Sequence, residues 1–277
     1  MVTTSLVPRL LRRHTGGGLT GVLARAGSVT NRDLMATRHS GYWLVVLSGF
    51  VEPALYLFSI GIGVGALVGD FHLADGRTVS YAAFVAPAML AASAMNGAMA
   101  EATYNFFARL KWAKLYDAMV ATPLRPVEIA LGELAWALLR GALYSVVFLA
   151  MMAALDLTTV ARAVPALFAS LLVGLAFGAV GMAISTYLRT WQDFDYLSVF
   201  TFAMFLFSGT FVPADSYPRA LEVVIALTPL YHGVELLRGF TLGALDWAMV
   251  GHAAYLVALA GVGLWIASRR MSRLLCR

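Results

Sequence analysis

The chain has 277 residues, of which 60% are hydrophobic and only 13% are charged. Soluble globular proteins usually carry about 25% charged residues, so this composition predicts a membrane protein. The net charge of +5 comes without a basic stripe interleaved with aromatic residues, which argues against a nucleic-acid partner. The single cysteine, Cys276, allows neither an internal disulfide nor a Cys/His metal cluster.

The first 42 residues are expected to form a cytoplasmic lead-in. They begin with three arginines and a glycine run, and Arg25 and Arg32 then interrupt the apolar residues. A cleaved signal peptide would need an unbroken apolar stretch of about 7–15 residues at this point. We therefore expect no cleaved signal in this segment.

Beyond the lead-in, several apolar runs reach the length of about 20 residues that a helix needs to cross a bilayer. They predict an all-α membrane protein with one transmembrane domain, residues 43–268, followed by a cytoplasmic tail at 269–277. Six transmembrane helices are expected at about 43–68, 81–107, 128–155, 166–188, 194–212 and 248–268. No convincing internal repeat divides the chain.

The basic residues between the expected spans predict the orientation of the chain. With both termini in the cytoplasm, 15 of the 20 Lys and Arg residues lie on the cytoplasmic side and four lie outside. The remaining one, Arg140, falls within a span. Because cytoplasmic loops of membrane proteins are enriched in Lys and Arg, both termini are predicted to be inside.

The segment 109–123, between the second and third spans, is expected to form a short amphipathic helix on the cytoplasmic face, ending before Pro123. With a helical period, its apolar and aromatic residues share one arc and its charged residues the opposite arc. The first arc contains Trp112, Leu115, Tyr116, Met119 and Val120, and the second contains Lys111, Lys114 and Asp117. Such a helix can lie among lipid headgroups or dock into a groove on a soluble partner, and the residues alone leave both open.

The ionisable residues within the expected spans include Glu52, Glu101, Glu133 and Arg140. A charge at the centre of a span costs about 2.5–3.5 kcal/mol, so such residues usually face a bundle interior or a wet path. We expect Glu52 and Arg140 to pair near mid-membrane, and Glu101 and Glu133 to line an inner vestibule. The alternative is that all four only hold helices together.

The segment between Pro213 and Asp246 is moderately apolar but is broken by prolines and glycines. Half-helices are expected at 217–227 and 230–242. Irregular backbone at membrane depth survives only where it is buried in protein or faces water, so a re-entrant helical hairpin on the outer face is predicted. Its polar residues are Tyr231, His232, Glu235 and Arg238, some of which are expected to satisfy the hairpin's own polar groups.

Two further features of the sequence bear on catalytic chemistry. The sequence contains no Gly-x-x-x-x-Gly-Lys-Ser/Thr, so it has no phosphate-cradling loop of its own. Ser208 and the distant His252 could be compared with an intramembrane serine protease, because a nucleophilic serine needs a base within reach. However, the position two residues before Ser208 is Leu206 and not the expected glycine, which disfavours this reading.

Six stretches in order carry a resemblance to a known family. They are 42–53, 86–97 (which contains Asn96), 114–123, 131–141, 191–195 and 228–239. Together with the expected spans, they resemble ABC-2-type transporter permeases, and more closely the nodulation-factor export and daunorubicin-resistance permeases. The resemblance covers nearly the whole chain from Arg32 to Arg273 and includes an interfacial helix in the lead-in.

The resemblance implies that the 109–123 helix is a coupling helix that receives the movement of a nucleotide-binding partner. It implies that Lys111, Trp112, Lys114, Leu115, Tyr116, Asp117 and Met119 contact that partner. The substrate path or intramembrane polar network would then contain Glu52, Asn96, Glu101, Glu133 and Arg140. It further implies a non-catalytic permease in a bacterial inner membrane, paired with a second permease chain.

In such an assembly, separate ATPase subunits bind ATP and Mg, and this chain needs no cofactor. The exported substrate would be amphipathic, lipid-like, glycolipid or drug-like. A second hypothesis is an ion- or proton-coupled secondary carrier that uses Glu52, Glu101 and Arg140. Carriers usually show repeat symmetry, which this sequence lacks. A membrane-embedded enzyme is the third hypothesis.

Overall fold

The structure is a computed structural model that describes residues 18–38, 51, 55, 57–72, 76 and 78–275. Glu52, Cys276 and residues 43–50, 53, 54 and 56 of the first expected span, 43–68, lie outside the described residues. The described elements are helices, apart from one two-stranded ribbon. The prediction of an all-α architecture is thus confirmed in outline, with the ribbon as its one exception in this part of the chain.

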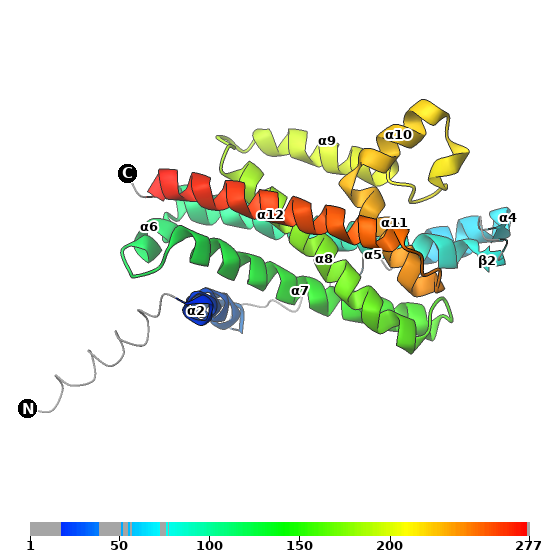
Figure 1. Ribbon diagram of the computed structural model, residues 1–277, viewed down its shortest axis with the longest axis horizontal. Helices are drawn as coiled ribbons and strands as arrows, with labels where there is room; N and C mark the ends of the chain where they lie inside the picture. Colours follow the sequence, from blue (N-terminus) through cyan, green and yellow to red (C-terminus); the bar gives the residue numbers. More distant parts are fainter. Residues whose placement is uncertain are drawn as a thin grey trace, which may run out of the picture.

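Among the described residues, four helices are long and apolar enough to cross a membrane, and they make up the bundle in Figure 1. The first, Tyr81–Trp112, comprises α5 (Tyr81–Ala100) and the π-helical segments η2 (Glu101–Asn105) and η3 (Ala108–Trp112). The others are α7 (Pro126–Ala154), α8 (Val160–Ser185) and α12 (Ala248–Leu275). These helices match the spans expected at 81–107, 128–155, 166–188 and 248–268.

Shorter elements surround this bundle. They are α2 (Leu19–Arg38), η1 (Leu57–Val64), α4 (Gly65–Val68), α6 (Leu115–Val120), α9 (Asp193–Leu206), η4 (Ala214–Ser216), α10 (Arg219–Leu227) and α11 (Pro229–Leu242). Strands β1 (Asp70–His72) and β2 (Thr78–Ser80) pair antiparallel, with Asp70 opposite Ser80. Ser80 then caps α5, because its Oγ accepts a hydrogen bond from the Ala83 N–H at 3.3 Å.

The long helix that starts with α5 lies at the centre of the bundle, and α12 lies at its edge. In the most apolar part of each helix, 78% of the residues from the first are buried, against 17% for α12. The helices approach closely where glycine removes the side chain. At Gly263 of α12, a Cβ would lie 2.7 Å from the main-chain carbon of Ala179 in α8. Small residues at such crossings are typical of helix packing in membranes.

The fifth expected span, 194–212, is not confirmed as a full crossing. Helix α9 has 14 residues, or about 21 Å at 1.5 Å per residue, which is short of a hydrocarbon core of about 30 Å. The helix ends at Leu206, and Gly209 follows in a left-handed conformation with φ of +70°. Only glycine adopts that conformation without steric cost.

Helices α10 and α11 confirm the half-helices expected at 217–227 and 230–242. Their axes are bent by 84° at Thr228. Pro229 explains the bend, because proline has no N–H to donate and disfavours the helical conformation in the preceding residue. Thr228 is accordingly extended, with φ −73° and ψ 134°. The pair is either one broken span or a re-entrant loop.

The prediction of a single amphipathic helix at 109–123 is wrong. The helix from Tyr81 continues through Trp112, and the chain then breaks at Lys114, whose φ of 46° is left-handed. Helix α6 starts afterwards and has only six residues. Because of the break, Trp112 and Tyr116 do not share an arc: Trp112 is 63% exposed and Tyr116 is fully buried.

Helix α2 packs against α7 and crosses the bundle, so that Figure 1 shows it nearly end-on below α7. The contact is close because Gly132 of α7 has no side chain. A Cβ there would lie 2.5 Å from the Val29 Cβ and 2.6 Å from the Ala26 carbonyl oxygen of α2. Thr30 adds a hydrogen bond from its Oγ1 to the Gly132 carbonyl at 3.0 Å. The part of the lead-in that is described thus forms an integral part of the bundle.

Candidate functional site: a charged junction beside α6

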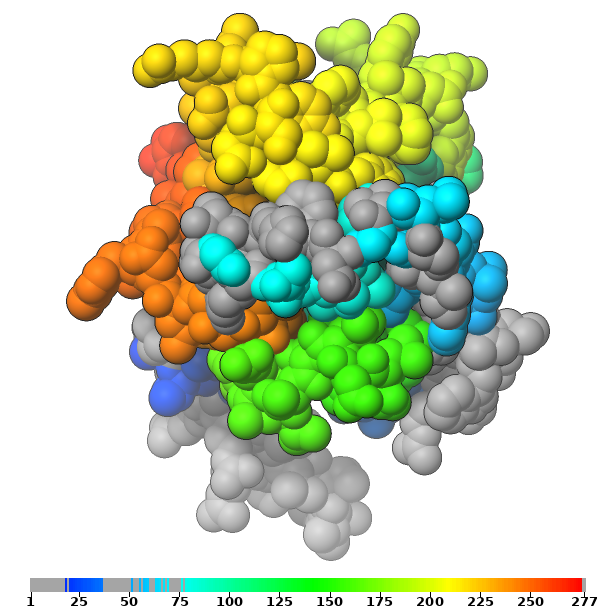
Figure 2. Space-filling model, turned by 90° about the vertical axis from the view of Figure 1, so that its right-hand side faces the viewer, coloured from blue at the N-terminus to red at the C-terminus, as the bar shows by residue number. Residues whose placement is uncertain are grey.

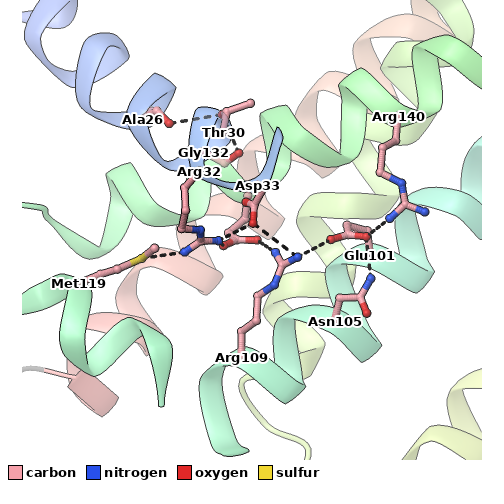
Figure 3. Close-up of polar contacts among 11 residues, drawn as sticks. Ala26, Thr30, Arg32, Asp33, Glu101, Asn105, Arg109, Met119, Gly132 and Arg140 are labelled. Carbon is pink, nitrogen blue, oxygen red and sulfur yellow. Dashed lines mark hydrogen bonds and ion pairs between the residues drawn. The ribbon is translucent and has the colours of Figure 1, made fainter. Parts of the chain in front are cut away.

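Six charged residues from three helices meet beside α6, and we call them the charged junction (Figure 3). Helix α2 contributes Arg32 and Asp33, the helix Tyr81–Trp112 contributes Glu101 and Arg109, and α7 contributes Glu133 and Arg140. Three arginines face three carboxylates, so the junction is formally neutral. It joins segments about 100 residues apart in the sequence, since Arg32 contacts Glu133 across 101 positions.

Each carboxylate of the junction pairs with two arginines, and Glu101 also accepts a hydrogen bond from an amide. Glu133 accepts from Arg32 at 2.9 Å and from Arg109. Glu101 accepts from Arg109 at 3.2 Å, from Arg140, and from the Asn105 amide at 2.7 Å. Asp33 pairs with Arg32 at 2.6 Å and with Arg109 at 3.6 Å.

Burial makes these pairs interdependent. Glu101 and Glu133 are both only 4% exposed. A buried pair gives little net stability by itself, but removal of one partner leaves an uncompensated charge that costs about 3–5 kcal/mol. Arg109 is the central group, because it touches all three carboxylates of the junction. The arrangement is therefore sensitive to any shift of α2, α7 or the Tyr81–Trp112 helix against the other two.

The junction revises the expected pairing of the intramembrane charges. Arg140 pairs with Glu101, while Glu52, its expected partner, lies outside the described residues. Glu101 and Glu133 were expected to line a vestibule, but both are held by arginines, as expected of groups that join helices. Asn96 is exposed and lines a separate small cavity of about 110 Å³ between the Tyr81–Trp112 helix and α9. The substrate-path role of these residues stays a prediction.

Helix α6 is attached to the bundle through Tyr116. Its ring lies 5.1 Å from that of Phe106 and belongs to an apolar cluster that includes Ile129 of α7 and Met182 of α8. Burial of the phenol, together with the nearby Glu133 carboxylate, raises the pKa of Tyr116 well above its ordinary value. A second link runs from α6 to the junction, because the Arg32 Nη1 lies 3.4 Å from the Met119 sulfur.

The other residues predicted to contact a partner lie at or near the surface. Lys111, Trp112, Lys114 and Asp117 are exposed, and Leu115 and Met119 are half-buried. The segment thus presents charged residues and one large aromatic outward while Tyr116 anchors it inward. This separation fits an element that both meets a partner and transmits its position into the bundle.

Trp112 contacts the loop at 189–195, whose residues have no predicted role in the sequence. Its ring meets that of Trp191 edge-on at 4.7 Å, and Trp191 in turn lies 5.1 Å from Phe194 at the start of α9. Asp193 holds this loop, because its Oδ2 accepts from the N–H groups of Arg189 at 2.7 Å and Thr190 at 3.1 Å. The exposed surface beside α6 therefore includes the 189–195 loop.

The basic and acidic residues of α2 are another part of the site that sequence analysis missed. Arg25 pairs with Glu128 at 2.7 Å, and Glu128 also accepts from the Arg125 N–H at 3.0 Å. Desolvation opposes the charge of Arg25, but the hydrogen bond to Glu128 is stronger and raises its pKa. The sequence does contain a sign of this contact, because Arg25 and Arg32 are seven residues apart and therefore lie on one face of a helix.

At the other end of the bundle, the predicted hairpin residues do come together. Arg238 donates to the carbonyl oxygens of Gly209 at 2.7 Å, Thr210 at 3.2 Å and Phe84 at 3.3 Å, and it pairs with Glu235 at 2.9 Å. Three of its four acceptors lie outside the 213–246 segment, so Arg238 joins α11 to α5 and to the turn after α9. His232 shares a 2.7 Å hydrogen bond with His252 of α12, next to Tyr231.

The protease reading finds no support in this geometry. His252 is bonded to His232, and the Ser208 hydroxyl lies 2.7 Å from that of Thr210 and 3.1 Å from the Phe205 carbonyl. Ser208 is also fully buried. A serine nucleophile needs a base within hydrogen-bond reach, and here both groups are engaged with other partners.

The four long apolar helices define an α-helical membrane protein. Comparison with known proteins matches residues 28–242 to the ABC-2 type transporter family. The chain is 35% identical to nodulation protein J of Rhizobium leguminosarum bv. trifolii over 72% of its own length and 74% of that protein. It is 32% identical to nodulation protein J of Rhizobium meliloti (strain 1021), again over 72% and 74% of the two chains.

A third relative, nodulation protein J of Sinorhizobium fredii (strain NBRC 101917 / NGR234), is 31% identical over 76% of this chain and 79% of its own. The chain belongs to the ABC-2 type transporter family. The resemblance stated from the sequence is therefore confirmed. The matched region includes the charged junction, α6, α9 and both helices of the hairpin.

Proposed function

We propose that this chain is the permease subunit of an ATP-binding-cassette exporter that is powered by a separate ATPase chain. The observation that carries the proposal is the position of the 111–120 segment: Lys111 and Lys114 are exposed beside α6, and Tyr116 of α6 attaches the segment to a family-matched bundle. Family membership and the lack of a phosphate-binding loop in this sequence support it. ATP and Mg then bind to the partner, and this chain needs no cofactor.

In this proposal, the ATPase docks on the surface formed by Lys111, Trp112, Lys114 and Asp117, with the 189–195 loop beside it. Movement of α6 reaches the bundle along two routes, the buried Tyr116 ring and the contact between Met119 and Arg32. Both end at the charged junction, where Arg109 can exchange between three carboxylates. A rigid-body shift of α2 and α7 against the central helix follows, a kind of transition in which packed elements switch between two arrangements.

The proposed membrane arrangement has six crossings with both termini in the cytoplasm of a bacterial cell, in the inner membrane. The end that carries α6 also carries Arg125, Arg189, Arg269 and Arg273, which supports a cytoplasmic position for it. The α10–α11 pair would then form a re-entrant hairpin on the outer face. Its 84° bend and its buried polar contacts support this placement.

A second permease chain is proposed to complete the transport path. Helix α9 supports this, since its exposed face carries large apolar residues, with Tyr196 79% and Val199 70% exposed. Such a face suits either lipid or another helix. The substrate is proposed to be amphipathic, lipid-like, glycolipid or drug-like. The small cavity near Asn96, which also contains the Tyr104, Ser198 and Thr201 side chains, would contribute neutral polar contacts to the path.

The experiment is affinity purification of the full chain in mild detergent, followed by transport in inside-out vesicles. We expect an ATP-hydrolysing subunit to co-purify and transport to need ATP while resisting a proton uncoupler. Transport that follows the proton gradient and needs no ATPase would favour the secondary carrier instead. Half-buried arginines already pair with Glu101 and Glu133, which weighs against free proton-binding carboxylates at those positions.

A further inference from the structure

A cavity of about 630 Å³ lies at the end of the bundle opposite α6. Its walls come from the 213–216 segment, from the facing sides of α10 and α11, and from the 244–252 segment at the start of α12. Figure 2 looks at this end of the molecule, with α10 in yellow and the start of α12 in orange. The volume falls in the range of small-molecule sites, about 300–1,000 Å³.

The charged groups of the wall are mostly acidic. The described lining contains four carboxylates, Asp215, Glu222, Glu235 and Asp246, against one guanidinium, that of Arg238. Asp215, Glu222 and Asp246 are exposed, and among the described residues none of the three forms an ion pair. An anion would therefore meet repulsion from most of the wall.

Arg238 does little to offset this bias, because four of its five N–H groups already have acceptors within the protein. Its Nε donates to the Phe84 carbonyl, its Nη1 to Glu235, and its Nη2 to the carbonyl oxygens of Gly209 and Thr210. The side chain is only 6% exposed and lies 3.8 Å above the Phe84 ring. The one cation of the described wall is thus mainly engaged by the protein's own acceptors and is already paired with Glu235.

The rest of the lining is apolar or aromatic. It includes Phe84, Leu242 and Met249, together with the half-buried Tyr231 and the His252 ring. Within the described residues, no group of three or more His, Cys, Asp or Glu side chains could hold a metal ion. A large cavity with an acidic rim and an apolar, aromatic wall suits a cation that carries an apolar part.

We propose that this cavity binds an organic cation, an amine or quaternary ammonium with an apolar substituent. The ligand contacts α11, α12 and the 213–216 segment together, so its binding holds the hairpin against the bundle. This site lies apart from α6 and the charged junction. The proposal therefore goes beyond the export function and does not depend on an ATPase partner.

The test is isothermal titration of the full chain at low salt in nanodiscs of a neutral glycolipid, whose headgroup carries no ammonium group, with benzyltrimethylammonium as the probe. Phenylacetate, of similar size and opposite charge, is the second probe. We expect the cation to bind more tightly than the anion, and the binding to weaken as salt rises. Absence of cation binding, or equal binding of both probes, would overturn the proposal.

The variants are Asp215→Asn with Glu222→Gln, and Asp156→Asn as the control. Asp156 is exposed and lies in the loop between α7 and α8, outside the cavity lining. The double variant removes two carboxylates from the rim and is expected to weaken cation binding roughly tenfold, because the attraction between the cation and both charges is lost. Asp156→Asn is expected to bind like the unmodified chain. An unchanged double variant, or an equal loss in the control, contradicts a ligand in this cavity.

One further arm separates the two sources of such a ligand. Nanodiscs doped with a small fraction of hexadecyltrimethylammonium present the same headgroup from the bilayer. If that amphiphile competes with benzyltrimethylammonium, the cavity is loaded from the membrane. If it does not compete while the soluble probe binds, the cavity takes its ligand from the aqueous phase. Either result supports the cation site and assigns its source.

Discussion

The two ends of the bundle both place arginines between helices, but the arginines have different partners. At the charged junction, Arg32, Arg109 and Arg140 meet the side-chain carboxylates of neighbouring helices. At the hairpin, Arg238 meets mainly main-chain carbonyl oxygens. Carboxylates on long side chains can change partners when helices move, whereas carbonyl oxygens hold their helices in fixed positions. The difference indicates a rearrangeable end beside α6 and a fixed end at the hairpin.

The largest effect is expected from a break in the junction. Glu133→Ala removes one of the two buried carboxylates that Arg109 and Arg32 share, and leaves them only Asp33 in common. We expect the free energy of unfolding to fall by about 3 kcal/mol. Thermal unfolding in detergent measures this effect. Glu222→Ala removes an exposed carboxylate and serves as the control, with a change within about 0.5 kcal/mol. If both variants melt together, the junction does not hold the helices.

A smaller effect is expected at the hairpin. Arg238→Met removes the donors to the carbonyl oxygens of Gly209, Thr210 and Phe84. Buried acceptors left without partners cost about 1–3 kcal/mol, so we expect a loss of about 2 kcal/mol. Arg219→Met, at an exposed position on the same hairpin, is the matched control. Retained stability in Arg238→Met would mean that the hairpin is held by apolar packing alone.

The contact between α2 and α7 permits a comparison of two glycines on one helix. Gly132→Ala forces a Cβ against Val29 and the Ala26 carbonyl, and overpacking of this kind costs at least about 1 kcal/mol. A Cβ at Gly141 meets nothing within 4 Å. Gly141→Ala should therefore stabilise α7 by about 0.5–1 kcal/mol. Limited proteolysis of α2 and thermal unfolding test both, and equal behaviour of the two variants would refute the close contact.

The smallest effect concerns pH. Hydrogen bonds from the Arg189 and Thr190 N–H groups lower the pKa of Asp193 below its ordinary value of 3.8. A carboxylate with a lowered pKa stabilises the fold above its ordinary pKa, and this contribution is lost as the pH falls through the lowered value. The 189–195 loop should therefore loosen only below pH 3.8. The fluorescence of Trp191 reports the change, and Asp193→Ala should show the loosened signal already at neutral pH.

The spans could be predicted from the sequence because they depend on local composition. Apolar runs of sufficient length gave helices at α5, α7, α8 and α12, and Pro229 marked the bend between α10 and α11. The 14-residue α9 was harder, because apolar residues continue past Leu206 while the backbone turns at Gly209. Hydropathy reports where a chain can lie in lipid, but it does not report where the helix ends.

The partners of the charged residues could not be predicted in the same way. The second span is expected to end at residue 107, yet the helix continues to Trp112. Glu101 therefore lies 11 residues from the helix end, or about 16 Å at 1.5 Å per residue, which brings it to the depth expected for Arg140. Asp33 and Arg32 enter the junction only because Gly132 lets α2 approach α7. Such contacts depend on tertiary packing between distant segments.

The most direct test of the central claim uses Lys111 and Lys114, which are the only lysines in the chain. The double variant Lys111→Glu with Lys114→Glu should keep its thermal stability, because both side chains are exposed. We expect ATP-driven transport in vesicles that contain the ATPase to fall at least about tenfold, as a like-charge contact disfavours docking. Arg219→Glu, at the opposite end, should transport normally. Unchanged transport in the double variant would contradict the account that the partner's energy enters through α6.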